Sequence, residues 1–135
     1  MRRAVLDPGV FVSAMCNTRG TPAALVARAG DGEFELVVSP QLLAELEDVL
    51  LRDKFRRYVD VETVEVFLAA IRQEATVAPD PTEPPPFHSV DPKDDYLIAL
   101  AYTQKAILIS GDSDLLDLTA GAPICAPADL SGVST

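Results

Sequence analysis

Residues 34–51, FELVVSPQLLAELEDVLL, contain the pattern that decides the fold class. Phe34–Val38 is a short apolar run, which is typical of a strand buried on both faces. Ser39 and Pro40 follow as a helix-opening pair, a side-chain cap and then a proline in the first turn, and we expect the helix to continue to about Leu51. A buried strand that leads directly into a helix is the repeating unit of an α/β domain.

The same alternation extends outward in both directions. Further short strands are expected at Arg3–Leu6, Ile107–Ile109 and Ile124–Cys125. Because these strands alternate with helical patterns, we predict an α/β domain with a mainly parallel sheet. The remaining expected elements are a turn at Pro8-Gly9, a helix capped by Thr21 and ending near Gly30, a helix capped by Asp60 from Val61 to about Gln73, a helix from Asp91 to about Lys105, and a short helix near Leu115–Leu118.

A proline-rich stretch interrupts this alternation. Prolines stand at positions 79, 81, 84, 85 and 86, which excludes both a helix and a central strand there. Neither flank is large enough to fold alone, so we expect residues 1–135 to form a single domain with 79–90 as an internal loop.

Composition narrows the class of function. The chain has 11 Lys and Arg against 21 Asp and Glu, a formal net charge of −10, which argues against binding nucleic acid through a broad basic surface. The net charge still allows an enzyme that acts on nucleic acid, because bound metal ions can neutralise acidic side chains. With 48% hydrophobic residues and no apolar run near the ~20 residues of a membrane span, we expect a soluble, cytoplasmic protein with no membrane partner.

Two aspartates follow expected strands directly. Asp7 ends the Arg3–Leu6 strand, and Asp112 comes just after Ile107–Ile109. Ligands of open α/β sheets bind outside the carboxyl ends of the strands, so both side chains are expected at that edge. Each aspartate taken alone has a simpler explanation, since this residue is common in turns and caps.

Two further acids are expected to lean toward the same edge. Glu45 lies on the margin of the apolar stripe of its helix, although it could equally be a solvated glutamate. Asp94 shares a helical face with Leu97 and Ile98, whereas Asp95 lies farther round, so Asp94 is the better inward candidate. Acids in the first turn of a helix also suit its dipole, which is the structural alternative.

Carboxylates gathered at one edge repel each other unless a cation lies between them. Oxygen ligands of this kind select Mg²⁺ or Mn²⁺. One or two such ions could activate water for displacement at a phosphodiester. A basic cluster at Arg52, Lys54, Arg56 and Arg57 could hold the phosphates of a nucleic acid, or could simply be solvated cations near the end of a helix.

Four segments in a fixed order give the chain a family resemblance. They are VLDPGVFVSA (5–14), LVVSP (36–40) with LAEL (43–46), DPKD (91–94) with ALA (99–101), and LISGDSDLL (108–116). Together these segments resemble a PIN-domain ribonuclease, in particular the VapC-like toxins of toxin–antitoxin pairs. The resemblance covers about residues 1–130.

The resemblance implies a three-layer fold with a central sheet flanked by helices, and a Mg²⁺- or Mn²⁺-dependent endoribonuclease held in check by a small antitoxin. It also implies a homodimer. By the same resemblance, Glu45 is either a metal ligand or the base that positions water. Asp7, Asp94 and Asp112 match the metal-binding acids, and Asp114 is a possible additional one. Ser110 matches a small hydroxyl residue that is usually threonine, and we expect it to contact the substrate.

One position departs from the family pattern. The opening motif usually has an asparagine two residues after the first aspartate, and this chain has Gly9. A catalytically weakened PIN domain that acts as a protein-binding module therefore remains the main alternative. A receiver-like signalling domain is disfavoured because no lysine follows Ile107–Ile109 or Ile124, and a nucleotide-binding fold because the chain has no G-x-G-x-x-G motif.

Overall fold

The computed structural model describes residues 2–85, 95–110 and 124–125. Its sheet has the strand order β3-β2-β1-β4-β5, and every neighbouring pair is parallel. The predicted parallel α/β architecture is therefore confirmed. The strands are β1 (Arg3–Leu6), β2 (Glu35–Val38), β3 (Thr76–Val77), β4 (Ile107–Ile109) and β5 (Ile124–Cys125).

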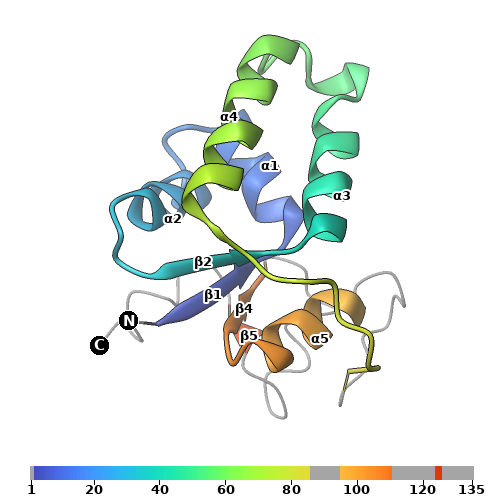
Figure 1. Ribbon diagram of the computed structural model, residues 1–135. Helices are drawn as coiled ribbons and strands as arrows, with labels where there is room; N and C mark the ends of the chain where they lie inside the picture. Colours follow the sequence, from blue (N-terminus) through green and yellow to red (C-terminus); the bar gives the residue numbers. More distant parts are fainter. Residues whose placement is uncertain (1, 86–94, 111–123, 126–135) are drawn as a thin grey trace.

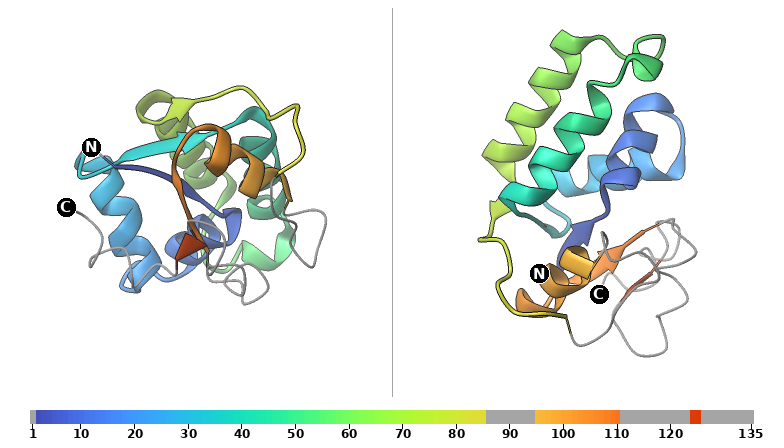
Figure 2. Two further views of the ribbon diagram at one scale, coloured as in Figure 1. Left: turned by 90° about the horizontal axis from the view of Figure 1, so that it is seen from below. Right: turned by 90° about the vertical axis from the view of Figure 1, so that its right-hand side faces the viewer.

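Helices cover both faces of this sheet. Helices α1 to α4 lie on one face and α5 lies on the other, as Figures 1 and 2 both show. The handedness of the connections explains this division, because right-handed crossovers that run in opposite directions along a sheet lie on opposite faces. The helices are α1 (Pro8–Cys16), α2 (Thr21–Gly30), α3 (Pro40–Leu50), the 3₁₀ turn η1 (Asp53–Phe55), α4 (Val61–Glu74) and α5 (Asp95–Thr103).

The order of the strands reverses beside β1. From β1 the chain winds outward to β2 and β3, then returns to the other side of β1 as β4, and β5 follows. The carboxyl ends of β1 and β4 therefore flank a topological switch point, which is where open α/β sheets bind their ligands.

Helix α1 corrects the expectation of a turn at Pro8-Gly9. The Asp7 carboxylate accepts a hydrogen bond from the backbone N–H of Gly9 at 2.9 Å and so caps the helix. Pro8 fits the first helical position because its missing N–H would be unpaired there in any case. Burial of Val10, Phe11 and Ala14 then fixes α1 in the core.

The start of α2 is also corrected by one residue. Its N-cap is Gly20, not Thr21, and no side chain caps it. The helical ladder begins at the Gly20 carbonyl, which accepts from the N–H of Ala24 at 3.2 Å. Strand β3 was not predicted, since its two residues are exposed and give no apolar run.

The other two predicted caps are confirmed. Ser39 Oγ accepts from the N–H of Leu42 at 3.3 Å at the start of α3, and Asp60 Oδ1 accepts from the N–H of Thr63 at 2.7 Å at the start of α4. The apolar stripe of α3 enters the core, where Leu42, Leu43, Leu46 and Leu50 are all buried.

Several expectations fall partly or wholly on residues that the structure does not describe. Residues 79–85 of the proline-rich segment form neither helix nor strand, whereas 86–90 lie outside the described residues. The expected start of a helix at Asp91 and the short helix near Leu115–Leu118 also lie outside them. Within the described part of the chain, every helix is too short or too polar to cross a bilayer.

Candidate active site at the carboxyl edge of the sheet

The carboxyl ends of β1 and β4 bring Asp7 and Ser110 together. Leu6 pairs with Ile109 in the sheet, and the N–H of Asp7 continues the ladder by donating to the Ile109 carbonyl at 3.0 Å. Asp7 and Ser110, which follow Leu6 and Ile109, are therefore neighbours across the ends of the two strands. Ser110 Oγ donates to Asp7 Oδ2 at 2.8 Å.

Both oxygens of the Asp7 carboxylate are thereby oriented. Oδ1 accepts from the Gly9 N–H, as described for the helix cap, and Oδ2 accepts from a serine that is 0% exposed. Asp7 itself is half-buried, so its carboxylate can still be reached from solvent. An oriented, accessible carboxylate at a switch point is suited to binding a cation or a water molecule.

Glu45 lies on α3, which begins at the same edge of the sheet. It is half-buried on α3, whereas the nearby acids Glu47 and Asp48 are exposed, so Glu45 is the acid of this helix that turns inward. Tyr96 Oη, on α5, donates to Glu45 Oε2 at 2.6 Å. This distance lies at the short end of the range for O–H···O hydrogen bonds.

The remaining predicted acids are outside the described residues. This applies to Asp94, Asp112 and Asp114, so their positions relative to Asp7 stay a prediction. Asp95 is described as the first residue of α5 and is half-buried.

The described residues fit a hard divalent cation in chemistry but do not complete a site. Asp7 and Glu45 offer carboxylate oxygens, the ligands that Mg²⁺ and Mn²⁺ prefer. Among the residues that the structure describes, no group of three or more His, Cys, Asp or Glu side chains could hold an ion. A full ligand set would need further groups, and the sequence prediction assigns them to Asp94, Asp112 and Asp114, which lie outside the described residues.

Comparison with known proteins identifies the family. Residues 3–114, most of the chain, match the PIN domain family. This chain is a PIN-domain protein. The uncharacterized protein MJ1680 of Methanocaldococcus jannaschii is 30% identical over 117 residues, which cover 86% of this chain and 74% of that protein.

A solved structure supports the fold. A PilT N-terminus domain protein, SSO1118, from the archaeon Sulfolobus solfataricus superimposes with a TM-score of 0.54, covering 98% of this chain and 92% of that one. The two sequences are 16% identical, so this likeness concerns the fold. It confirms the three-layer PIN-like arrangement expected from the sequence.

The basic cluster of this PIN domain lies away from the acidic edge. Helix α3 begins at the carboxyl end of β2 and runs away from the sheet for about 16 Å, and the cluster follows its far end (Figure 1). Arg56 Nη2 donates to the Leu50 carbonyl and so caps α3. Arg52 pairs with Asp48 at 3.2 Å, and the ammonium group of Lys54 lies 5.1 Å from the centre of the Phe55 ring. The structure thus does not bring these cations next to Asp7.

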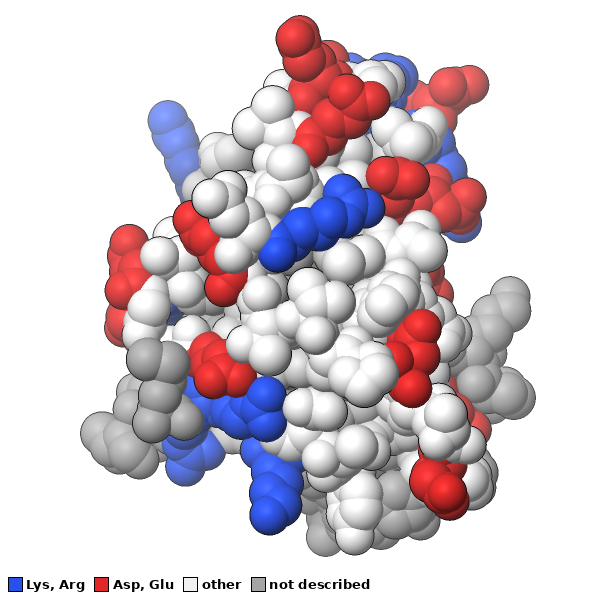
Figure 3. Space-filling model, in the orientation of Figure 1, with Lys and Arg blue, Asp and Glu red and all other residues white. Residues whose placement is uncertain are grey.

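Charged groups are dispersed on the face shown in Figure 3. Acidic and basic side chains lie in small separate groups with broad uncharged areas between them. On the described part of this face, no continuous basic surface is present. The described residues of this face therefore offer no extended basic track for a nucleic acid.

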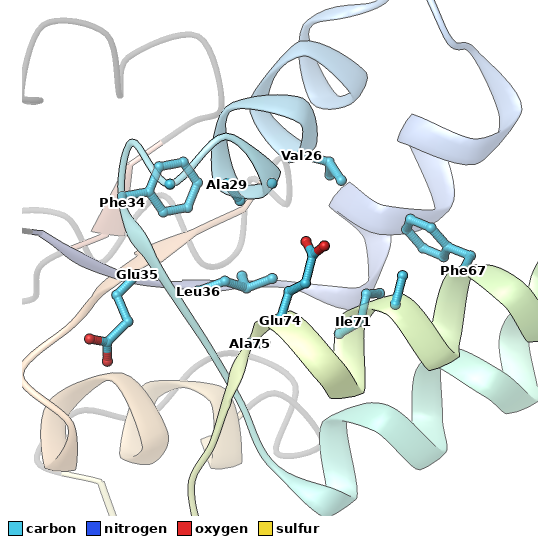
Figure 4. Close-up of a pocket in the computed structure, with 12 residues that line it drawn as sticks. Val26, Ala29, Phe34, Glu35, Leu36, Phe67, Ile71, Glu74 and Ala75 are labelled. Carbon is cyan, nitrogen blue, oxygen red and sulfur yellow. The ribbon is translucent and has the colours of Figure 1, made fainter.

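An apolar groove lies at the opposite edge of the sheet. It has a volume of about 440 Å³ and lies between α2, α4 and the start of β2. In Figure 4 the carboxylate of Glu74 points across the groove and that of Glu35 points away, and Glu35 is bound to Arg3 at 2.8 Å. Because β2 begins here, this groove is separate from the edge that carries Asp7.

Tyr96 is the residue at this edge that sequence reasoning missed. It follows Asp95 in an apolar helical pattern, where a tyrosine is most simply explained as a core residue. Its partner, Glu45, is 51 positions away in the sequence. No local spacing rule joins the two, so only the packing of α3 and α5 around the sheet edge shows the pair.

Proposed function

We propose that this PIN-domain protein is an endoribonuclease that requires Mg²⁺ or Mn²⁺ and cleaves RNA phosphodiester bonds at the carboxyl edge of its sheet. PIN-domain proteins are typically nucleases, and the chain belongs to that family. The observation that carries the proposal is the Asp7 carboxylate, fixed by Ser110 at the switch point between β1 and β4.

The ion would be held by Asp7 together with Asp94, Asp112 and Asp114, the acids that the family resemblance supplies. When bound, the ion would act as a Lewis acid that activates a water molecule and offsets the negative charge of the phosphate. Ser110 would fix the direction in which Asp7 presents its oxygens. Glu45 would either bind the ion or accept a proton from the attacking water, and its bond from Tyr96 keeps the carboxylate at this edge in both roles.

Flexible single-stranded RNA is the substrate that suits this surface. The chain has no tryptophan and carries a net charge of −10, so it lacks both an obvious base-stacking platform and a broad basic track. Arg52 and Lys54 would bind phosphates remote from the cleaved bond, because both are exposed at the far end of α3. The sequence also suggested Arg56 for this role, but its guanidinium caps α3 and is largely buried.

The proposed biological role is that of a toxin in a toxin–antitoxin pair, with a small cognate antitoxin as partner and a homodimer as the active form. This role rests on the VapC-like order of motifs along the sequence. Growth arrest on expression in a bacterial host tests it. Wild-type protein should arrest growth and Asp7→Asn should not; growth arrest that is equal for both would contradict a nuclease toxin.

Purified protein incubated with a mixed pool of single-stranded RNA tests the activity itself. Cleavage should require Mn²⁺ or Mg²⁺, stop with EDTA and disappear in Asp94→Asn. Cleavage that continues in EDTA would contradict the proposal. Cleavage by Asp94→Asn at the wild-type rate would reject the assignment of Asp94.

A PIN domain weakened in catalysis and used for protein binding is the second candidate, and Gly9 is the observation that favours it. A β-carbon added at Gly9 would stand 3.5 Å from Asp7 Oδ1. The asparagine usual in the family would therefore begin beside the candidate metal-binding carboxylate. With glycine, the backbone N–H is retained and any side-chain hydrogen bond is absent.

A further inference from the structure

We infer that Tyr96 is a positioning residue that holds the Glu45 carboxylate where it binds the divalent ion, directly or through a bound water. The inference rests on the proposed metal-dependent nuclease. Its basis is the 2.6 Å hydrogen bond from Tyr96 Oη to Glu45 Oε2.

The directions of the two helices explain why this bond lies at the carboxyl edge. Helix α3 starts where β2 ends, and Glu45 is at its sixth position, about 8 Å along the axis. Side chains of a helix lean toward its N-terminus, so Glu45 leans back toward the sheet. Helix α5 precedes the parallel strand β4 and therefore begins at the same edge, where Tyr96 is in its first described turn.

A glutamate in this position needs such a partner. Its side chain has three rotatable bonds and is half-buried on the margin of an apolar stripe, so without a donor its carboxylate would be free to turn toward water. A rigid phenol has only two side-chain torsions and loses less entropy on fixing the acid. The bond also joins α3 and α5, which cover opposite faces of the sheet (Figure 1).

Calorimetric titration with Mn²⁺ in the absence of RNA tests the inference. Tyr96→Phe keeps the packed ring and removes only the hydroxyl, and we expect it to weaken Mn²⁺ binding by about 10-fold, the usual lower effect of losing a group that orients a metal ligand. Tyr102→Phe is the matched control, because Tyr102 is on the same helix and is 61% exposed. It should bind Mn²⁺ as the wild type does.

A double-mutant cycle separates positioning from general structural support. If Tyr96 acts through Glu45, adding Tyr96→Phe to Glu45→Ala should cause no further loss of Mn²⁺ affinity. An equal loss in both backgrounds would overturn the inference, as would wild-type affinity in Tyr96→Phe. Thermal unfolding in EDTA checks that each variant folds.

The same titrations distinguish failure of this inference from failure of the proposed function. Wild-type protein that binds Mn²⁺ but leaves the mixed RNA pool intact would reject cleavage of the RNAs in that pool, and the cycle would still decide the role of Tyr96. Wild-type protein that binds no Mn²⁺ would overturn both the metal site and the role of Tyr96. RNA cleavage and Mn²⁺ binding that are both unchanged in Tyr96→Phe would reject the positioning role alone.

Discussion

Ser110 contributes its hydroxyl group to the site, and this group is directed at Asp7. The Ser110 side chain is buried, and its hydroxyl donates to Oδ2 of the aspartate at 2.8 Å. Ser110→Ala should therefore lower Mn²⁺ affinity or the cleavage rate by about 10- to 100-fold, since the carboxylate loses the donor that orients it. Ser110→Thr, which keeps the hydroxyl, is the matched comparison. Equal rates for the alanine and threonine variants would show that the hydroxyl has no role.

Gly9 allows a test in which a substitution should raise the rate of RNA cleavage and not lower it. It has no positive φ, is exposed, and an added β-carbon would make only an ordinary 3.5 Å contact with Asp7 Oδ1, so the helix start can accept a side chain. Gly9→Asn should fold normally and raise the rate of RNA cleavage if the missing amide limits activity. A wild-type protein that cuts little, together with a Gly9→Asn variant that cuts no better, would instead indicate a narrow substrate range.

At this scale, helical geometry favoured Glu45 as the inward acid of its helix. Glu45 was separated from Glu47 and Asp48 because it borders the apolar stripe, and its half-buried state agrees. The hydrogen bond from Tyr96 could not be predicted, because it depends on how two distant helices pack.

Among the elements, helix α4 provides a stability test with a defined pH dependence. Hydrogen bonds from the side chain and then the backbone N–H of Thr63 lower the pKa of Asp60 from its ordinary value of 3.8, and the charge of Arg56 acts in the same direction. The ionised cap therefore stabilises the folded state above that ordinary pKa, and this contribution disappears as the pH falls through the lowered pKa.

Asp60→Ala should lower the thermal midpoint at pH 7, and its difference from the wild type should shrink as the pH is lowered below 3.8. Circular dichroism melting curves across this range provide the measurement. Asp60→Asn keeps an uncharged cap, so its difference from Asp60→Ala should depend little on pH. A gap between wild type and Asp60→Ala that does not change with pH would contradict the role of the charge.

Local sequence patterns suffice to predict some of the elements but not others. Ser39 was predicted as a cap because Pro40 follows it, and Asp60 because it precedes a helix with an apolar face. Helix α1 was missed because proline and glycine in succession also favour a turn, and the deciding interactions are its cap bond and the burial of Phe11 in the tertiary core. Strand β3 exists only through its pairing with β2.

For the molecule as a whole, the distance between the acidic edge and the basic cluster predicts a dependence on RNA length. Arg52 and Lys54 are exposed at the far end of α3, so only a long RNA could touch them while being cut at Asp7. Arg52→Ala/Lys54→Ala should weaken binding of a long RNA, and reduce its salt dependence by about 0.7 in log–log slope for each phosphate that is no longer neutralised. Cleavage of a short oligonucleotide should be unchanged.

Binding assays at several salt concentrations provide the comparison. Equal affinity of wild type and variant for the long RNA would exclude this surface from the substrate path. The net charge alone could not show whether this surface binds RNA, because it gives the total of the charges but not their placement around the sheet.

The rate of metal-dependent RNA cleavage by Asp7→Asn is the sharpest test of the proposed active site. Asparagine can still cap α1, so folding should be preserved, whereas loss of the charged ligand should reduce cleavage by about 100-fold or more at every Mn²⁺ concentration. Asp31→Asn, the same change on an exposed residue at the end of α2, should cut RNA as the wild type does. Cleavage by Asp7→Asn at the wild-type rate would show that the carboxyl edge of this sheet is not the catalytic site.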